Sequence, residues 1–208
     1  MDIRTAIGVL LAGSTGLWSC AASQRADPFH TVNRTTPGLR QLSFGAGSRL
    51  YQDENLGKLD NPILLALDYC EPFGFERLRL EGGLHYTYDE ADDTSGGNDV
   101  RLKGETLELS AGLNGFLRLG RLRPYAGFGG SLQFLNLRGV DAASSTLFDD
   151  DDAVFGGYVK GGILFDISPV SHFGVEYRHF EGGDASLDGS SFGTAYDQFL
   201  LVFGTSFE

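Results

Sequence analysis

Apolar and polar residues alternate with a period of two along residues 75–89, whose sequence is FERLRLEGGLHYTYD. Leucines and tyrosines fall on one face of this stretch, whereas arginine, glutamate and histidine fall on the other. Successive side chains of a β-strand point to opposite faces, so the pattern predicts a strand. One face of that strand is apolar and the other is ionised.

The same alternation recurs in seven further segments. They span about residues 41–52, 61–69, 100–119, 122–138, 153–167, 172–181 and 194–207. Each reaches or approaches the roughly nine to eleven residues that a tilted strand needs to cross a bilayer. Long strands of this kind predict an all-β fold, an eight-stranded antiparallel transmembrane β-barrel with up-and-down meander topology, lipid outside and a polar interior.

The connections between these segments alternate in length. Long polar stretches follow the first, third, fifth and seventh segments, at residues 53–60, 90–99, 139–152 and 182–193. Tight links follow the others, at residues 71–74, 120–121 and 168–171. Bacterial outer-membrane barrels have long loops outside the cell and short turns in the periplasm. We therefore expect an outer-membrane protein of a Gram-negative bacterium with both barrel ends in the periplasm.

Composition narrows the range of functions. The chain has 208 residues with 30 glycines, 12% aromatic residues and a net charge of −12. The negative charge argues against nucleic acid as a partner, because phosphates are bound by Lys and Arg. Two cysteines, Cys20 and Cys70, do not make a disulfide framework. No apolar run of about twenty residues follows the N-terminal region, so we expect no transmembrane helix.

The N-terminal region predicts export. Arg4 precedes a short apolar stretch at residues 6–18, which is typical of a signal peptide covering residues 1–22. Residues 17–20 (LWSC) resemble a lipobox, which would start the mature chain at a lipidated Cys20. Ordinary cleavage after Ala22 is the alternative. Residues 23–40 then form a periplasmic linker, and residues 41–208 form the barrel.

Four stretches carry a resemblance to a known family: PYAGFGGSL from Pro124, GGYVKGGILFDISP from Gly156, FGVEYRHFEG from Phe173 and DQFLLVFGTSF from Asp197. The sequence resembles the small outer-membrane β-barrels, the group of OmpA-like and opacity-type eight-stranded barrels. The resemblance implies a monomer in contact with outer-membrane lipid and lipopolysaccharide. It also implies insertion by the barrel-assembly machinery, which reads the last strand. Such barrels serve many functions, so the family does not identify one.

Ionisable residues on the inner face form the first candidate site. The set comprises Arg49, Asp68, Arg77, Arg79, Glu81, Glu108, Lys160, Asp166, Glu176 and Arg178, with His85 among them. The interior of an eight-stranded barrel is just wide enough for side chains to fill. Charges held away from water must pair, so we expect a lumen charge network. A gated path for protons or ions is the functional alternative.

The second candidate lies on the outer wall. His179 and Glu181 continue the outward phase of the seventh segment. Their placement resembles the lipid A deacylase barrels, whose catalytic His and Ser are two residues apart on the outer wall. Glu181 occupies the position of the Ser, and a carboxylate does not replace a hydroxyl nucleophile. No acid partner follows at the spacing of that family.

Acidic runs in the long connections form the third candidate. Asp149, Asp150, Asp151 and Asp152 are consecutive, and clustered carboxylates suit calcium. They lack the ligand spacing and turn glycine of an EF-hand loop, so a solvated, mutually repelling surface is the simpler interpretation. Divalent ions bridging these loops to lipopolysaccharide phosphates remain an alternative.

These observations predict a non-catalytic outer-membrane protein without a cofactor. We expect a structural or surface-interaction role through acidic extracellular loops. Two alternatives stay open: a barrel enzyme that hydrolyses acyl chains of lipid A, and a narrow passive pore.

Overall fold

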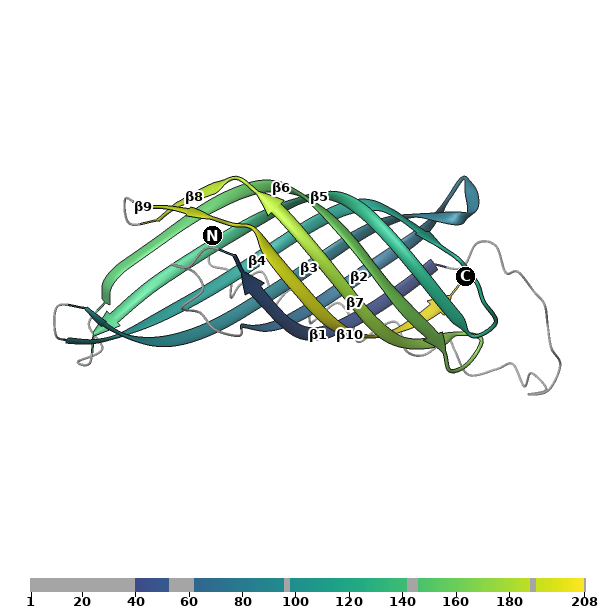
Figure 1. Ribbon diagram of the computed structural model, residues 1–208, viewed down its shortest axis with the longest axis horizontal. Coiled ribbons are helices and arrows are strands. Elements are labelled where there is room, and N and C mark those ends of the chain that lie inside the picture. Colours follow the sequence, from purple (N-terminus) through teal and green to yellow (C-terminus); the bar gives the residue numbers. More distant parts are fainter. Residues whose placement is uncertain (1–39, 53–61, 96–97, 142–145, 188–189, 208) are drawn as a thin grey trace. The chain divides into compact units, whose positions relative to one another are not determined.

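The computed structural model describes residues 40–52, 62–95, 98–141, 146–187 and 190–207. Eight long strands form a closed barrel in the order β1-β10-β7-β6-β5-β4-β3-β2 (Figure 1). Their bounds are β1 Arg40–Tyr51, β2 Ile63–Phe73, β3 Phe75–Ser95, β4 Asn98–Phe116, β5 Leu122–Asp141, β6 Thr146–Asp166, β7 Ser171–Gly182 and β10 Tyr196–Phe207. Two short strands, β8 Asp184–Leu187 and β9 Ser190–Gly193, form a separate hairpin. The predicted all-β, eight-stranded meander is confirmed.

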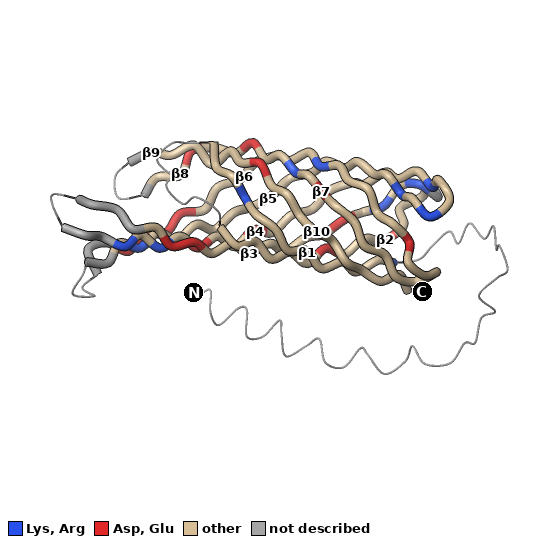
Figure 2. The backbone as a smooth tube through the Cα atoms, turned by 60° about the horizontal axis from the view of Figure 1, so that its bottom comes forward, with Lys and Arg blue, Asp and Glu red and all other residues tan. Residues whose placement is uncertain are grey.

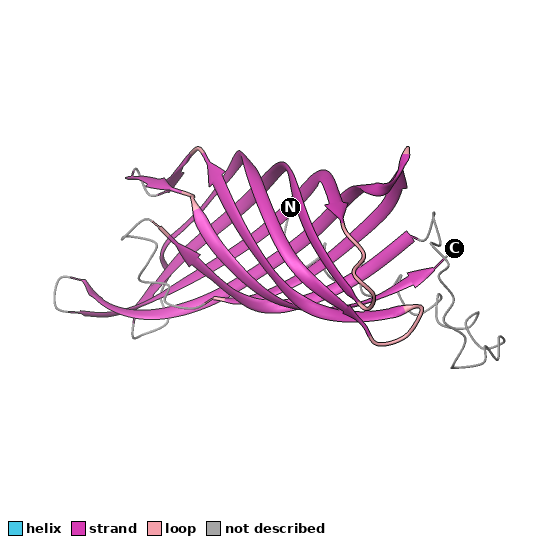
Figure 3. Ribbon diagram, turned by 45° about the vertical axis from the view of Figure 1, so that its right-hand side comes forward, coloured by secondary structure: helices cyan, strands magenta, loops and turns pink. Residues whose placement is uncertain are grey.

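The first and last long strands close the barrel. β1 pairs antiparallel with β2 and also with β10, from Arg40 opposite Phe207 to Tyr51 opposite Tyr196. Every long strand therefore has two hydrogen-bonded neighbours, as the continuous wall in Figure 3 shows. A closed barrel leaves no unpaired strand edge, which is the condition for placing a sheet in lipid. No helix in the described part of the chain is long and apolar enough to cross a membrane.

The wall is apolar outside and polar inside. Leu201 and Phe155 on the outer face are 70% and 71% exposed. Arg49, Glu108 and Arg178 on the inner face are completely or almost completely buried. β10 shows the alternation without interruption, because every second side chain from Tyr196 to Ser206 is buried. A protein in water would not expose its large apolar side chains and bury its charges, so the wall is built to face lipid.

Three short connections lie at one end of the barrel. Gly74 joins β2 to β3 and Gly120 lies between β4 and β5, both with φ of +66°, a conformation that favours glycine. In the third, Ser168 Oγ accepts hydrogen bonds from the backbone N–H groups of Val170 and Ser171. The barrel ends Arg40 and Phe207 pair at this same end. The loop-length rule predicts that this is the periplasmic end, and we name it so below.

The opposite end differs from the sequence-based prediction. Residues 90–99 and 139–152 are mostly strand rather than loop: β3 and β4 stay paired up to Ser95 and Asn98, and β5 and β6 up to Val140 and Thr146. These strands have polar residues on both faces, because neither face meets lipid. The alternation of apolar and polar residues that predicts a strand is therefore absent from them. The β8–β9 hairpin was also missed. Residues 53–61 of the first long connection lie outside the described part of the chain.

Glycines allow close packing inside the wall. Gly112 and Gly129 lie directly opposite each other on β4 and β5. A Cβ atom at Gly129 would lie 2.2 Å from the carbonyl oxygen of Ala111 and 2.7 Å from Tyr158 Oη. The missing side chains thus make room for the phenol of Tyr158 within the lumen.

Candidate functional site

We call the half of the bore farther from the three short connections the upper lumen, and the half nearer to them the lower lumen. Glu108 lies at the centre of the upper lumen. Its carboxylate accepts a hydrogen bond from Arg49 Nη2 at 2.7 Å and another from Arg178 Nη2. Tyr196 Oη and Ser131 Oγ each donate to it at 2.6 Å. Four donors from β1, β5, β7 and β10 therefore converge on one carboxylate of β4. A buried carboxylate is tolerated only when it is paired and hydrogen-bonded in this way.

Aromatic rings hold the two guanidinium groups in place. Arg49 lies over the ring of Tyr196 at 3.9 Å from the centroid, and Arg178 lies over the ring of Tyr158 at 3.8 Å. Phe180 stacks on Tyr196 with centroids 5.0 Å apart. Cation–π contacts compensate part of the hydration that each guanidinium loses on burial. The side chains together fill the bore.

His85 connects the two halves of the lumen. Its Nδ1 lies 3.3 Å from Arg178 Nη1 and 3.3 Å from Gln198 Nε2, and its Nε2 lies 3.2 Å from Asp68 Oδ1. Both neighbours of Nδ1 are donors, so Nδ1 accepts and Nε2 carries the proton donated to Asp68. The ring is thus a neutral bridge between a cation and a carboxylate.

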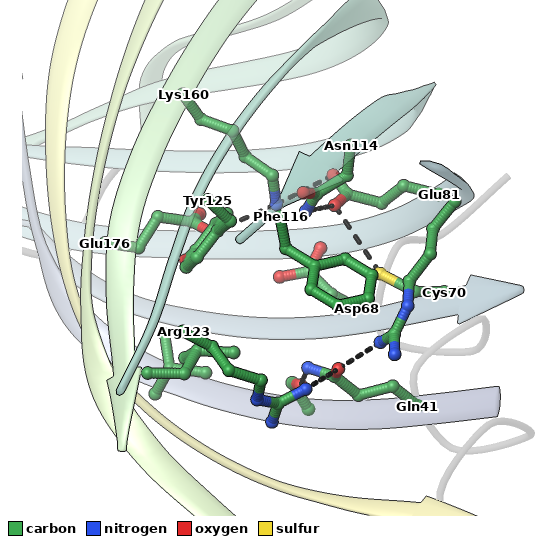
Figure 4. Close-up of a pocket in the computed structure, with 14 residues that line it drawn as sticks. Gln41, Asp68, Cys70, Glu81, Asn114, Phe116, Arg123, Tyr125, Lys160 and Glu176 are labelled. Carbon is green, nitrogen blue, oxygen red and sulfur yellow. Dashed lines mark hydrogen bonds and ion pairs between the residues drawn. The ribbon is translucent and has the colours of Figure 1, made fainter. Parts of the chain in front are cut away.

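Lys160 is the centre of the lower lumen (Figure 4). Its ammonium group lies 2.7 Å from Glu81 Oε1 and 3.0 Å from Glu176 Oε2. Tyr125 Oη donates to Glu176 at 2.6 Å, and Asn114 Nδ2 donates to Glu81 at 3.1 Å. The same carboxylates line a cavity of about 30 Å³ together with Asp68, Cys70 and Arg79. A cavity of this size holds about two waters, which is too small for a solute path.

Arginines surround the periplasmic mouth below this cavity. Arg79 Nη1 and Arg123 Nη1 both donate to Gln41 Oε1, the latter at 3.3 Å. Arg123 Nε also lies 2.8 Å from Asp166 Oδ1, and Arg118 Nη2 lies 3.6 Å from Asp166 Oδ2. Asp166 therefore belongs to the mouth rather than to the central lumen.

The structure brings most of the sequence-predicted lumen residues together. Arg49, Asp68, Glu81, Glu108, Lys160, Glu176 and Arg178 are buried in the lumen, while Arg79 and Asp166 lie at the periplasmic mouth. Arg77 is a correction: its side chain is exposed next to the β2–β3 turn, because its strand position lies beyond the enclosed bore. The predicted charge network left out Tyr158, Tyr196 and Gln198, which carry no charge but complete its contacts.

The outer wall holds a second polar group. His179 Nδ1 lies 2.9 Å from Asp197 Oδ1, and Tyr177 Oη donates to the same oxygen at 2.6 Å. Asp197 is the cross-strand partner of His179 on β10. An acid partner therefore exists, although the sequence suggested none, because it comes from the neighbouring strand. Glu181 Oε2 lies 3.5 Å from His179 Nε2 and occupies the place that a nucleophile would need.

The four consecutive aspartates do not converge on one ion. They lie along β6, where successive side chains alternate between faces. Hydrogen bonds from Arg138 and then Asn136 lower the pKa of Asp149, and backbone N–H groups of Ser186 and Ala153 lower the pKa of Asp152. No group of three His, Cys, Asp or Glu side chains suited to a metal occurs within the described ranges.

Predictions for the N-terminal region lie almost entirely outside the described residues. These are the signal peptide over 1–22, the lipidation of Cys20 and the linker up to residue 39. Arg40, the last residue of the expected linker, is already part of β1. Cys70 is buried in the lumen with its thiol 3.6 Å from Glu81 Oε2.

Comparisons with known proteins extend the description of the fold. No protein-family model matches the sequence, and a search of curated proteins finds no significant match. Among solved structures, OprG from Pseudomonas aeruginosa superposes with a TM-score of 0.60 at 12% identity, covering 82% of this chain and 96% of OprG. Ail, the attachment invasion locus protein of Yersinia pestis, has a TM-score of 0.54 at 14% identity, with coverage of 82% and 99%.

Neisserial surface protein A gives a TM-score of 0.51 at 13% identity, covering 83% of this chain and 98% of its own. Identities this low show a shared fold alone. The polar lumen, the apolar wall and the short periplasmic turns agree with that fold. The chain therefore has the fold of the small eight-stranded β-barrels of the bacterial outer membrane.

Proposed function

We propose that this protein is a closed, non-catalytic membrane anchor that presents acidic hairpins at the cell surface for interaction with other molecules. The observation that carries the proposal is the filled bore. Glu108, Arg49 and Arg178 close its upper part, and Lys160 with Glu81 and Glu176 closes its lower part. Charges packed this tightly form a structural core rather than a passage.

The hairpins beyond the wall supply the surface for interaction. Residues 89–105 carry six carboxylates and two basic groups, which gives a net charge of −4. Residues 136–152 carry five carboxylates and one basic group, which also gives a net charge of −4. Lys103 pairs with Glu90 across the β3–β4 hairpin at 2.7 Å, and the described strands of both hairpins stay paired beyond the wall. A surface of one charge sign attracts partners of the opposite sign and raises their association rate. We therefore propose a cationic partner.

A polyanionic ligand fits this surface poorly. Ail, which shares the fold, has been solved in complex with the heparin analogue sucrose octasulfate. Sulfate groups would be repelled by the carboxylates of the two hairpins. We therefore propose that this chain, despite the shared fold, binds a cationic partner rather than an anionic one.

Binding to charged surfaces tests the proposal. Purified protein in lipid nanodiscs should bind immobilised polylysine but not heparin, and added salt should weaken the binding. Asp149→Asn with Asp151→Asn should lower polylysine binding several-fold, because both side chains are exposed on the β5–β6 hairpin. The matched control is Glu71→Gln with Glu76→Gln, which removes two carboxylates at the periplasmic end and should leave binding unchanged.

Electrical measurements examine the pore alternative with the same protein. A bore filled by ion pairs should give no sustained openings in planar bilayers. Sustained single-channel openings would contradict the anchor and favour the narrow pore. Equal loss of polylysine binding in both double variants would contradict the role of the hairpins.

The His179–Asp197 pair favours one second candidate, lipid A acyl hydrolysis on the outer wall. A histidine oriented by a carboxylate is two-thirds of a hydrolytic triad, but the described part of this wall offers Glu181 where a hydroxyl is needed. We expect lipid A from expressing cells to keep all its acyl chains by mass spectrometry. Loss of a chain that disappears with His179→Ala would establish the enzyme instead.

A further inference from the structure

The periplasmic end of the barrel is rich in arginine although the whole chain is acidic. Lys and Arg positions gather there in Figure 2. The cluster comprises Arg77 and Arg79 near the start of β3, Arg118 and Arg121 in the connection between β4 and β5, and Arg123 at the start of β5. We call these five residues the arginine rim. Arg40 at the same end is already paired with Glu71 at 3.3 Å.

Few carboxylates balance the arginine rim. Asp166 lies 2.8 Å from Arg123 and 3.6 Å from Arg118. Glu76 lies next to Arg77 at the start of β3, and its side chain is outside the described part of the structure. Within the described residues, no carboxylate lies within ion-pair distance of Arg77, Arg79 or Arg121.

Two guanidinium groups of the rim share one neutral acceptor. Arg79 and Arg123 both donate to the amide oxygen of Gln41, and Arg123 is nearly completely buried. Arg79 also lies over the ring of Phe116 at 4.6 Å from its centroid. Two cations held this close repel each other, and an amide oxygen supplies no compensating charge. An added anion would reduce the repulsion at the mouth.

Apolar side chains alternate with the exposed arginines. Along the β4–β5 connection, Leu117, Leu119 and Leu122 are 52%, 63% and 46% exposed. Arg118 and Arg121 lie between them and are exposed as well. Leucines of this kind enter the acyl region while arginines reach the headgroups next to it. The turn is therefore placed at the boundary between lipid tails and lipid headgroups.

We propose that the arginine rim binds the phosphate of an anionic phospholipid in the periplasmic leaflet of the outer membrane. Guanidinium groups match phosphate oxygens in bidentate hydrogen bonds, and they are weakly hydrated. The flanking leucines select a phosphate attached to acyl chains over a soluble one. Arg118 and Arg121 contact the headgroup from the turn, while Arg79 and Arg123 provide the positive potential behind it.

Native mass spectrometry of the full-length protein in detergent tests this site with phosphatidylglycerol and phosphatidylethanolamine as probes. The protein should retain phosphatidylglycerol in preference. Arg118→Gln with Arg121→Gln should lower that affinity about 30-fold, since each arginine near a lipid surface contributes about a fivefold change. Heat-modifiable gel mobility verifies that the variants are folded.

The control removes two arginines elsewhere. Arg40→Gln with Arg138→Gln alters the net charge equally, but both residues already have carboxylate partners. This variant should retain phosphatidylglycerol as the unaltered protein does. An equal loss in both variants, or equal retention of the two lipids, would overturn the proposal. Displacement of the lipid by inorganic phosphate would overturn the phospholipid as the occupant.

Discussion

Replacing Glu108 by glutamine should lower the free energy of unfolding by about 3–5 kcal/mol, the usual cost of breaking a buried ion pair from one side. The carboxylate is the shared counter-charge of Arg49 and Arg178, which are both completely buried. The amide keeps the shape of the side chain but removes its charge. Urea-induced unfolding of the barrel in lipid vesicles, followed by gel mobility, measures the change.

A second substitution separates lost charge from lost packing. Arg178→Met in the Glu108→Gln background should destabilise the barrel less than Arg178→Met alone, because it removes a cation that has lost its partner. Glu71→Gln is the matched control, since Glu71 pairs with Arg40 at the surface, and its effect should stay within about 1 kcal/mol. Additive effects of the two lumen substitutions would show that Glu108 is not the shared counter-charge.

Replacing Lys160 by methionine should have an effect of similar size, about 3–5 kcal/mol. Methionine fills the space of the alkyl stem but leaves Glu81 and Glu176 facing each other without a cation. Both carboxylates are almost completely buried, so water does not compensate for the lost ammonium group. The same unfolding experiment measures the loss.

Glu81→Gln should recover part of the stability of the Lys160→Met variant, because it removes one of the two unpaired charges. Lys103→Met provides the comparison at the surface. Lys103 pairs with Glu90 on the β3–β4 hairpin, where both side chains are partly exposed and the pair is screened by solvent. If both lysine variants unfolded at the same urea concentration, Lys160 would have no special structural role.

Glu108 and Lys160 belong to different layers of one lumen. The upper layer joins β1, β4, β7 and β10 around Glu108, and the lower layer joins β3, β6 and β7 around Lys160. His85 links them through Arg178 and Asp68. Strands on opposite sides of the bore are thus tied together across it. Ionised side chains form the core of this barrel, because its apolar side chains lie on the outer wall facing lipid.

The fold class and the inward or outward face of most residues in the barrel wall follow from the linear sequence. Alternation with a period of two is a local property, so Leu201 outside and Arg178 inside follow from a few neighbouring residues. Connection lengths are local as well, and they predicted which end carries Gly74 and Gly120. Where polar residues cover both faces, as in residues 90–99, the local signal ended and the strands were missed.

Which side chains meet inside the barrel depends on how the strands are arranged in three dimensions. Glu108 contacts Arg49 and Arg178 because the register of each strand and the closure of β1 on β10 bring distant positions to one level of the bore. Arg77 is exposed because its position at the start of β3 lies beyond the enclosed bore, and the register of β7 against β10 gives His179 its partner Asp197. Alternation specifies the side of a wall, whereas pairing across the wall depends on strand register, which no single segment contains.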